Sequence, residues 1–88
     1  MPITMTQQSP GMPAEAYDEI IANLAQPLRQ SAGFISHTAQ LTGQGVTVTE
    51  VWETSEHWQR WYDANVKPHL PEGAPDPMLV DIHYALGR

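Results

Sequence analysis

The sequence predicts an α+β domain with the element order β-α-β-β-α-β, and three observations support this. Short segments that alternate apolar and polar residues indicate strands, two segments with apolar residues at helical spacing indicate helices, and prolines and glycines separate them. This order is the split βαβ arrangement of ferredoxin-like domains, in which a four-stranded antiparallel sheet carries both helices on one face. We expect residues 1–88 to form a single domain, because so short a chain has no room for a second one.

The first strand is expected at residues 3–8, where β-branched and apolar residues alternate with polar ones. Pro13 is suited to the first position of the helix that follows, and acidic residues near its start complement the helix dipole. Because Pro27 lacks a backbone N–H, we expect this helix to stop or kink near Ala25 and Gln26. Its apolar face is formed by Tyr17, Ile20, Ile21, Leu24 and Leu28.

A β-hairpin is expected from residues 34–41 and 46–52, joined by the turn Gly43-Gln44-Gly45. Both faces of its second arm carry apolar residues, which favours an interior strand covered on both sides. The period of two places one set of side chains in the first arm on a common face: Ile35, His37, Ala39 and Leu41. The corresponding set in the second arm is Val46, Val48, Glu50 and Trp52.

Thr54 or Ser55 can cap a second helix that ends at Lys67-Pro68. Its buried stripe is predicted to consist of Trp58, Trp61, Tyr62 and Val66. Prolines 68, 71, 75 and 77 predict a stiff loop at residues 69–77, and renewed alternation predicts the last strand at residues 78–86.

Composition limits the partners of the protein. A net charge of -6 argues against nucleic acid and against anionic membranes, and no apolar run is long enough to span a bilayer. With no cysteine to staple a small core, oligomerisation is the remaining common source of stability. The expected strands carry apolar residues at too many positions for a bare, solvated sheet, so we expect a broadly apolar free face that meets its copy in a homodimer. The N-terminus does not resemble a secretory signal, so the expected location is cytoplasmic.

The strand entry Ala32-Gly33-Phe34-Ile35, the junction Glu50-Val51-Trp52-Glu53-Thr54-Ser55 and the aromatic helix after it resemble the antibiotic biosynthesis monooxygenase-like proteins of the dimeric α+β barrel superfamily. The resemblance covers nearly the whole chain in element order, but these motifs concern packing. It implies a homodimeric barrel and a range of activities: cofactor-free oxygenation of aromatic polyketides, haem degradation and polyketide cyclisation. Fold alone does not choose among them.

The haem-degrading members carry a tryptophan on the second helix and a histidine after it, which Trp61 and His69 resemble. Here the histidine is displaced towards the tryptophan, and the first strand lacks the asparagine of those enzymes. Plant cyclases of this fold also use a histidine just after the second helix, which again points to His69. The resemblance therefore leaves oxygenation and cyclisation open.

Histidine is the side chain whose ordinary pKa lies near neutrality, so His37, His69 and His83 are the candidate catalytic residues. His37 lies on a strand face that should be covered, where it is either a base or a hydrogen-bonded packing residue. Asp81 and His83 are two residues apart in the last expected strand, so their side chains share a face. Either Asp81 orients His83 as a general base for catalysis, or the two residues form a polar pair at the dimer seam. No ligand spacing supports a metal site.

Aromatic side chains at strand and helix spacing are usually core, yet this fold often keeps a pocket between the sheet and the second helix. The candidate substrate-binding residues are Tyr17, Trp52, Trp61 and Tyr84. The sequence therefore predicts a small enzyme without cofactor, in which a histidine deprotonates a planar substrate for oxygenation or cyclisation. The alternative is a non-catalytic homodimer that binds a small apolar or aromatic ligand or assists another enzyme.

Overall fold

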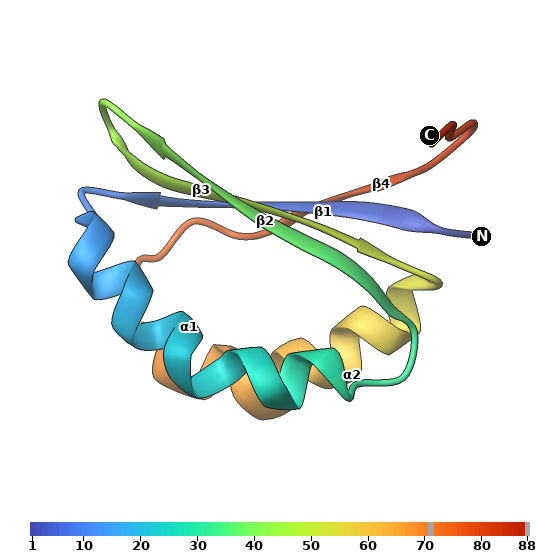
Figure 1. Cartoon of the computed structure of the whole chain (residues 1–88), viewed down its shortest axis with the longest axis horizontal. Helices are drawn as coiled ribbons and strands as arrows, with labels where there is room; N and C mark the ends of the chain where they lie inside the picture. The colour runs from blue at the N-terminus through green and yellow to red at the C-terminus, as the bar shows by residue number, and fades with distance from the viewer. Residues whose placement is uncertain (71, 88) are drawn as a thin grey trace.

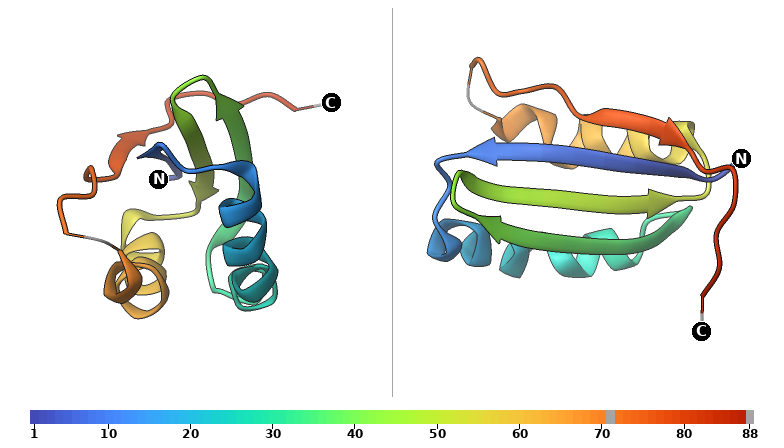
Figure 2. Two further views of the ribbon diagram at one scale, coloured as in Figure 1. Left: turned by 90° about the vertical axis from the view of Figure 1, so that its left-hand side faces the viewer. Right: turned by 90° about the horizontal axis from the view of Figure 1, so that it is seen from above.

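A computed structural model describes residues 1–70 and 72–87, and its elements follow the predicted order. The strands are β1 (Ile3–Pro10), β2 (Phe34–Thr42), β3 (Gly45–Trp52) and β4 (Met78–Asp81), and the helices are α1 (Ala14–Arg29) and α2 (Ser55–Asn65). A 3₁₀ turn, η1 (Lys67–His69), follows α2. The antiparallel sheet has the order β2-β3-β1-β4, and both helices cover one face of it (Figures 1 and 2). The predicted ferredoxin-like fold is confirmed.

The register of the central strand determines which side chains face the helices. Trp52 of β3 lies opposite Ile3 of β1, and Glu50 lies opposite both Met5 and His37. Directly opposed residues in an antiparallel sheet project from the same face. Glu50 and His37 therefore share the face that the helices cover.

A β-bulge in β2 changes the predicted face of this strand. Phe34 is opposite Trp52 and Ser36 is opposite Val51, so Ile35 is the extra residue between them. The prediction that Ile35 shares a face with His37 is therefore wrong, and the Ile35 side chain is 51% exposed. Phe34 takes the inner position instead and packs edge-on against Trp52, with ring centroids 5.5 Å apart.

Helix α1 continues through Pro27 to Arg29, so the predicted stop near Ala25 and Gln26 is wrong. Pro27 lies on the exposed side of the helix, where water can satisfy the carbonyl that loses its partner. The buried side chain of Leu28 extends the apolar stripe by another turn, and packing therefore outweighs the missing hydrogen bond.

Helix α2 agrees with its prediction. The Thr54 side chain accepts a hydrogen bond from the backbone N–H of His57 at 3.1 Å and so caps the first turn. Trp58 and Trp61 are buried, and Tyr62 and Val66 pack beside them. Pro71, one of the prolines expected to stiffen the following loop, lies outside the described residues.

The last strand is shorter than predicted. β4 ends at Asp81, and the next backbone N–H, of Ile82, donates to the Pro2 carbonyl at 2.9 Å. Pro2 precedes the first residue of β1, so the neighbouring strand offers few further partners, and alternation alone does not extend a strand past its neighbour. Residues 82–87 instead form an arm that leaves the sheet on the side away from the helices (Figures 1 and 2).

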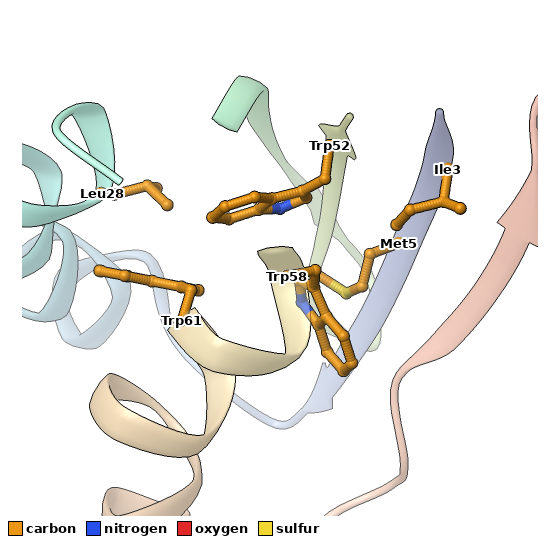
Figure 3. Close-up of a cluster of buried hydrophobic side chains, with 6 residues drawn as sticks. All are labelled: Ile3, Met5, Leu28, Trp52, Trp58 and Trp61. Carbon is orange, nitrogen blue, oxygen red and sulfur yellow. The ribbon is translucent and has the colours of Figure 1, made fainter. Parts of the chain in front are cut away.

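The largest cluster of buried apolar side chains lies at one end of the space between the sheet and the helices. It consists of Ile3, Met5, Leu28, Trp52, Trp58 and Trp61 (Figure 3). Trp52 is fully buried, and its ring centroid lies 6.5 Å from that of Trp61. Because Ile3 begins β1 and Trp52 ends β3, the tryptophans fill this end, and Val46 near the start of β3 is buried at the opposite end.

The uncovered face of the sheet is more polar than the sequence suggested. The register assigns to this face mainly hydroxyl and amide side chains: Thr4, Thr6, Gln8, Ser36, Thr38, Gln40, Thr47 and Thr49. Apolar residues on this face, Val51, Met78 and Val80, belong to positions near β4 and the end of β3. The expectation of a broadly apolar free face is therefore wrong, because the inner face of the same strands carries most of the apolar positions.

Candidate functional site

A pocket of about 120 Å³, here called the central pocket, lies between the sheet and the helices beside the core. Helix α1 supplies most of its apolar wall, Trp61 belongs to the wall from α2, and the inner face of the sheet supplies the rest. Its lining residues include Gln7, Ser9, Met12, Tyr17, Leu24, Leu28, His37, Glu50, Trp61 and Leu70. The sequence expected a pocket in this layer, and the structure contains one.

Glu50 is the one charged residue in the central pocket, and its exposure is only 4%. Burying a carboxylate is costly unless hydrogen bonds replace its water. Here Oε1 accepts from the Trp52 indole N–H at 2.9 Å, and Oε2 lies 2.6 Å from His37 Nδ1. The carboxylate is therefore satisfied at both oxygens by side chains of its own sheet.

His37 connects Glu50 to Tyr17. Its other ring nitrogen, Nε2, lies 2.6 Å from the Tyr17 hydroxyl, and the two rings are nearly parallel at 9°. A carboxylate only accepts hydrogen bonds, so Nδ1–H donates to Glu50 and Nε2 accepts from the Tyr17 hydroxyl. The result is a continuous chain in which Tyr17 donates to His37, and His37 donates to Glu50.

Tyr17 stays protonated at neutral pH in this setting. Burial raises its pKa above the ordinary value of 10.0, and the negative charges of Glu50 and Asp18 raise it further. Each of these effects disfavours the phenolate. Tyr17 therefore presents its proton to Nε2 of His37 and its oxygen lone pairs to any hydrogen-bond donor in the pocket.

The arrangement is suited to accepting a proton. A carboxylate that holds one ring nitrogen of a histidine selects the tautomer whose other nitrogen is basic, and it stabilises the imidazolium once formed. The same arrangement, in which a carboxylate orients a base that acts on a nucleophile or an acid, occurs on unrelated folds. At this pocket wall, Tyr17, His37 and Glu50 can take up a proton from a bound ligand.

The structure brings together three of the residues singled out in the sequence: Tyr17, His37 and Trp61 all line the central pocket. Trp52 was a candidate for substrate binding, but it is fully buried behind the pocket. Its contacts are with Glu50 and with the rings of Phe34 and Trp61. Trp52 thus holds other site residues in place.

The remaining candidates lie elsewhere. His69 is exposed and lines an adjoining groove of about 390 Å³ between α1 and the end of α2, which shares Leu24 and Val66 with the central pocket. His83 and Tyr84 belong to the arm after β4, where Tyr84 is 76% exposed. Asp81 is still in the strand whereas His83 is not, so the strand geometry expected to align them is absent.

Sequence reasoning did not select Glu50 as a site residue. A signal was present, because Glu50 interrupts the alternating inner face of an interior strand between Val48 and Trp52. A carboxylate at such a position needs specific partners. Its partner His37 was not identifiable, since it lies 13 residues away along the chain, and Tyr17, the partner of His37, lies a further 20 residues away.

Among residues 1–70 and 72–87, no three His, Asp or Glu side chains gather where they could hold a metal ion. Within the same residues, neither helix is both long and apolar enough to cross a membrane.

About two thirds of the chain matches a known protein family. Residues 9–66 match the family model described as antibiotic biosynthesis monooxygenase. The chain belongs to the antibiotic biosynthesis monooxygenase family. The matched range contains Tyr17, His37, Glu50 and Trp61, and the resemblance predicted from the local motifs is confirmed. No curated protein sequence matches the chain.

Solved structures similar to this family member share its fold along nearly the whole chain. A haem-degrading protein from Mycobacterium tuberculosis, in a haem-free form, has a TM-score of 0.64 at 22% identity, covering 99% of this chain and 100% of that one. A mutant of SnoaB, a cofactor-independent oxygenase from Streptomyces nogalater, has a TM-score of 0.63 at 18% identity over 99% and 96%. A Streptomyces coelicolor monooxygenase in complex with nanaomycin D gives 0.60 at 16% identity over 99% and 91%.

Proposed function

We propose that this protein is a small cofactor-independent enzyme that removes a proton from a small planar substrate, with His37 as the base. The observation that carries the proposal is the hydrogen-bonded chain of Tyr17, His37 and Glu50 at the wall of an apolar pocket. Family membership supports monooxygenase-like chemistry for such a site. We also propose that the protein acts in the cytoplasm.

The proton path follows from the hydrogen bonds. A substrate O–H in the pocket donates to the Tyr17 oxygen while the Tyr17 proton passes to His37 Nε2. Tyr17 ends the step as a neutral phenol, His37 becomes an imidazolium and the substrate becomes an anion. Glu50, 2.6 Å from Nδ1, stabilises the positive charge on the ring.

Two fates of the substrate anion share this first step. With dissolved oxygen as co-substrate, an activated methylene group and one O₂ give a carbonyl and one water. Without oxygen, the carbanion attacks a carbonyl of the same molecule and closes a ring by aldol addition. We propose the oxygenation for this chain because of its family, and the consumption of dissolved oxygen during turnover separates the two reactions.

The test of the base is His37→Gln, which keeps a polar side chain of similar size but removes the basic nitrogen. We expect kcat to fall by about 10² to 10⁴, the usual contribution of one general base. His69→Gln and His83→Gln remove the other candidate bases and are expected to keep kcat within a few fold. A large loss of kcat in either of these two variants, with an unchanged kcat in His37→Gln, would show that the base is not His37 in the central pocket.

The second candidate is a non-catalytic module that binds a small apolar or aromatic ligand. The apolar wall of the central pocket, with Trp61 in it, favours ligand binding whether or not chemistry follows. A binding module predicts that joint replacement of His37, His69 and His83 by Gln leaves biological activity and ligand affinity unchanged. Trp61→Ala would weaken binding in either case.

We also propose that two copies pair through the uncovered sheet face. The arm after β4 carries Tyr84 and Leu86, which are 76% and 83% exposed, and it lies on the side of the sheet away from the helices (Figures 1 and 2). Val80 and Met78 of β4 are also more than half exposed, at 57% and 65%. A second copy would cover these apolar side chains, while the threonines of the face pack between the two sheets.

A further inference from the structure

The groove beside His69, here called the outer groove, is continuous with the central pocket. It measures about 390 Å³ and lies between α1 and the end of α2, where the two helices run side by side in opposite directions (Figures 1 and 2). Four apolar residues line both spaces: Ile20, Leu24, Val66 and Leu70. A ligand in the central pocket can therefore continue into the outer groove along one apolar surface.

The other side chains of the outer groove are polar: Asn23, Asn65 and His69. Asn23 lies one helical turn after Ile20 on α1, and Asn65 lies one turn after Trp61 on α2. Each asparagine thus follows a residue of the central pocket along its own helix. Asparagine is a poor helix former, so helix formation alone does not favour Asn23 in the middle of α1.

Hydrogen bonds fix the orientation of both asparagine side chains. Nδ2 of Asn23 donates to the Glu19 carbonyl at 3.1 Å, and Nδ2 of Asn65 donates to the Trp61 carbonyl at 3.2 Å. Only the nitrogen of an amide can donate to a carbonyl, so the nitrogens are held against their own helices. The acceptor oxygen is then the end of each amide that does not face its helix carbonyl. The outer groove therefore offers a ligand two hydrogen-bond acceptors, one from each helix.

Charge limits which ligand group suits these acceptors. Among the described residues that line the outer groove, none is Lys or Arg, and the net charge of the chain is -6. A carboxylate here would meet acceptor oxygens without a Lys or Arg of the lining to balance its charge. A hydroxyl group can donate to an amide oxygen at no such cost. The outer groove is suited to a neutral hydrogen-bond donor.

The length of the combined site follows from the geometry of α1. Tyr17 and Asn23 are six residues apart in this helix, so their backbones lie about 9 Å apart along its axis. Resting on the proposed function, which places the acidic hydroxyl of the substrate at Tyr17, we infer a substrate class. The substrate is an elongated aromatic compound of more than one ring, and a second hydroxyl at its far end donates to Asn23 and Asn65 in the outer groove.

The test measures binding to the full chain by isothermal titration calorimetry with three rod-shaped probes. 4-Phenylphenol carries one hydroxyl, 4,4′-dihydroxybiphenyl carries a second one at its far end, and 4′-hydroxybiphenyl-4-carboxylate carries a carboxylate there. We expect the dihydroxy probe to bind the wild type about fivefold more tightly than 4-phenylphenol, the effect of one net hydrogen bond. The carboxylate probe should bind more weakly than either.

Leucine variants assign the second hydroxyl to the outer groove. Asn23→Leu and Asn65→Leu keep the size of the side chain but remove the acceptor, so each should weaken the dihydroxy probe about threefold or more. Neither should weaken 4-phenylphenol, whose binding also shows that the variants are folded. Gln59→Leu is the matched control, because Gln59 is an exposed amide of α2 that does not line the outer groove.

Three results would overturn the inference: equal affinity of the wild type for the two hydroxylated probes, tightest binding of the carboxylate probe, or unchanged affinity of both asparagine variants for the dihydroxy probe. These outcomes are distinct from failure of the proposed function. Oxygen consumption that is lost in His37→Gln, with a substrate that lacks a second hydroxyl, would support the function and overturn the inference. Selectivity for the dihydroxy probe that both asparagine variants lose, without any turnover that depends on His37, would overturn the function and support the assignment of the outer groove.

Discussion

Glu50 is the residue on which both the packing and the proposed chemistry depend. It is 4% exposed, and its two oxygens hold the Trp52 indole and the His37 ring. A buried carboxylate is not in itself evidence of stability, because its desolvation offsets the hydrogen bonds that it accepts. Its clear contribution here is orientation, since it keeps Nδ1 of His37 engaged and leaves Nε2 for the pocket.

Removing the Glu50 carboxylate should therefore destabilise the fold. Glu50→Ala leaves the N–H groups of Trp52 and His37 without acceptors, and we expect the free energy of unfolding to fall by about 3 kcal/mol. Glu50→Gln retains one acceptor oxygen and should lose about 1 kcal/mol. Urea denaturation measures both, with the exposed Glu53→Gln as control. Equal stability of Glu50→Ala and the wild type would contradict the assigned hydrogen bonds.

The raised pKa of Tyr17 predicts that the folded protein loses stability at alkaline pH. Burial, then the charges of Glu50 and Asp18, raise its pKa in the folded protein above the ordinary 10.0. The unfolded chain therefore releases this proton first. The stabilisation is complete below pH 10.0 and is lost as the pH rises through the folded-state pKa.

The measurement is the free energy of unfolding as a function of pH, together with phenolate absorbance. Tyr17→Phe should flatten the alkaline decline. Burial also raises the pKa of Tyr62, with Asp76 and Asp63 adding to it, so Tyr62→Phe should remove a separate part of the decline. If Tyr17→Phe left the alkaline decline unchanged, the burial of the Tyr17 hydroxyl against His37 would be in doubt.

At the scale of elements, the connection between α1 and β2 passes so close to α2 that it requires a glycine at position 33. Gly33 has a φ of +83°, a conformation that disfavours residues with a Cβ atom. A Cβ there would also collide with the ring of His57 at the start of α2. The backbone carbonyl of Gly33 accepts from Glu53 N–H at 2.8 Å, which ties the two connections together.

Gly33→Ala should accordingly be strongly destabilising. We expect a loss of about 2 kcal/mol or more in the free energy of unfolding, from the left-handed conformation together with displacement of His57. Gly43→Ala, in the hairpin turn, is the matched control because its added Cβ would meet no atom within 4 Å. Similar melting temperatures for the two variants would show that His57 moves aside easily.

At the scale of the whole molecule, the proposed dimer depends on the arm after β4. We expect the wild type to sediment at twice the mass of the chain at micromolar concentration. Replacing Tyr84 and Leu86 by Ser removes apolar area that only a partner would cover, so it should raise the dissociation constant about tenfold or more. Leu41→Ser changes an exposed residue on the other sheet face and should leave the dissociation constant unchanged. A monomeric, well-folded wild type would contradict the proposal.

Local patterns predicted the elements better than their ends. Thr54 as a cap and the stripe of Trp58 and Trp61 followed from helix rules alone, and α2 confirms them. The predicted helix end near Pro27 was wrong because the free-energy cost of a proline inside a helix depends on its tertiary surroundings. Here these are the access of water to the freed carbonyl and the packing of Leu28. The bulge at Ile35 and the early end of β4 depend in the same way on the neighbouring strands.

By itself, the order of apolar, polar and turn-forming residues determined the fold class, the helix faces and the local motifs of the family, because these depend on neighbours within a few positions. Only the tertiary structure decided that His37 meets Tyr17 and Glu50, that Trp52 lies behind the pocket, and that His69 and His83 are not among the residues that line it. The physical reason is long-range packing: the pairing of β2 with β3 places residues 13 positions apart within hydrogen-bond distance, and the packing of α1 on the sheet does the same for residues 20 positions apart. No local pattern encodes either arrangement.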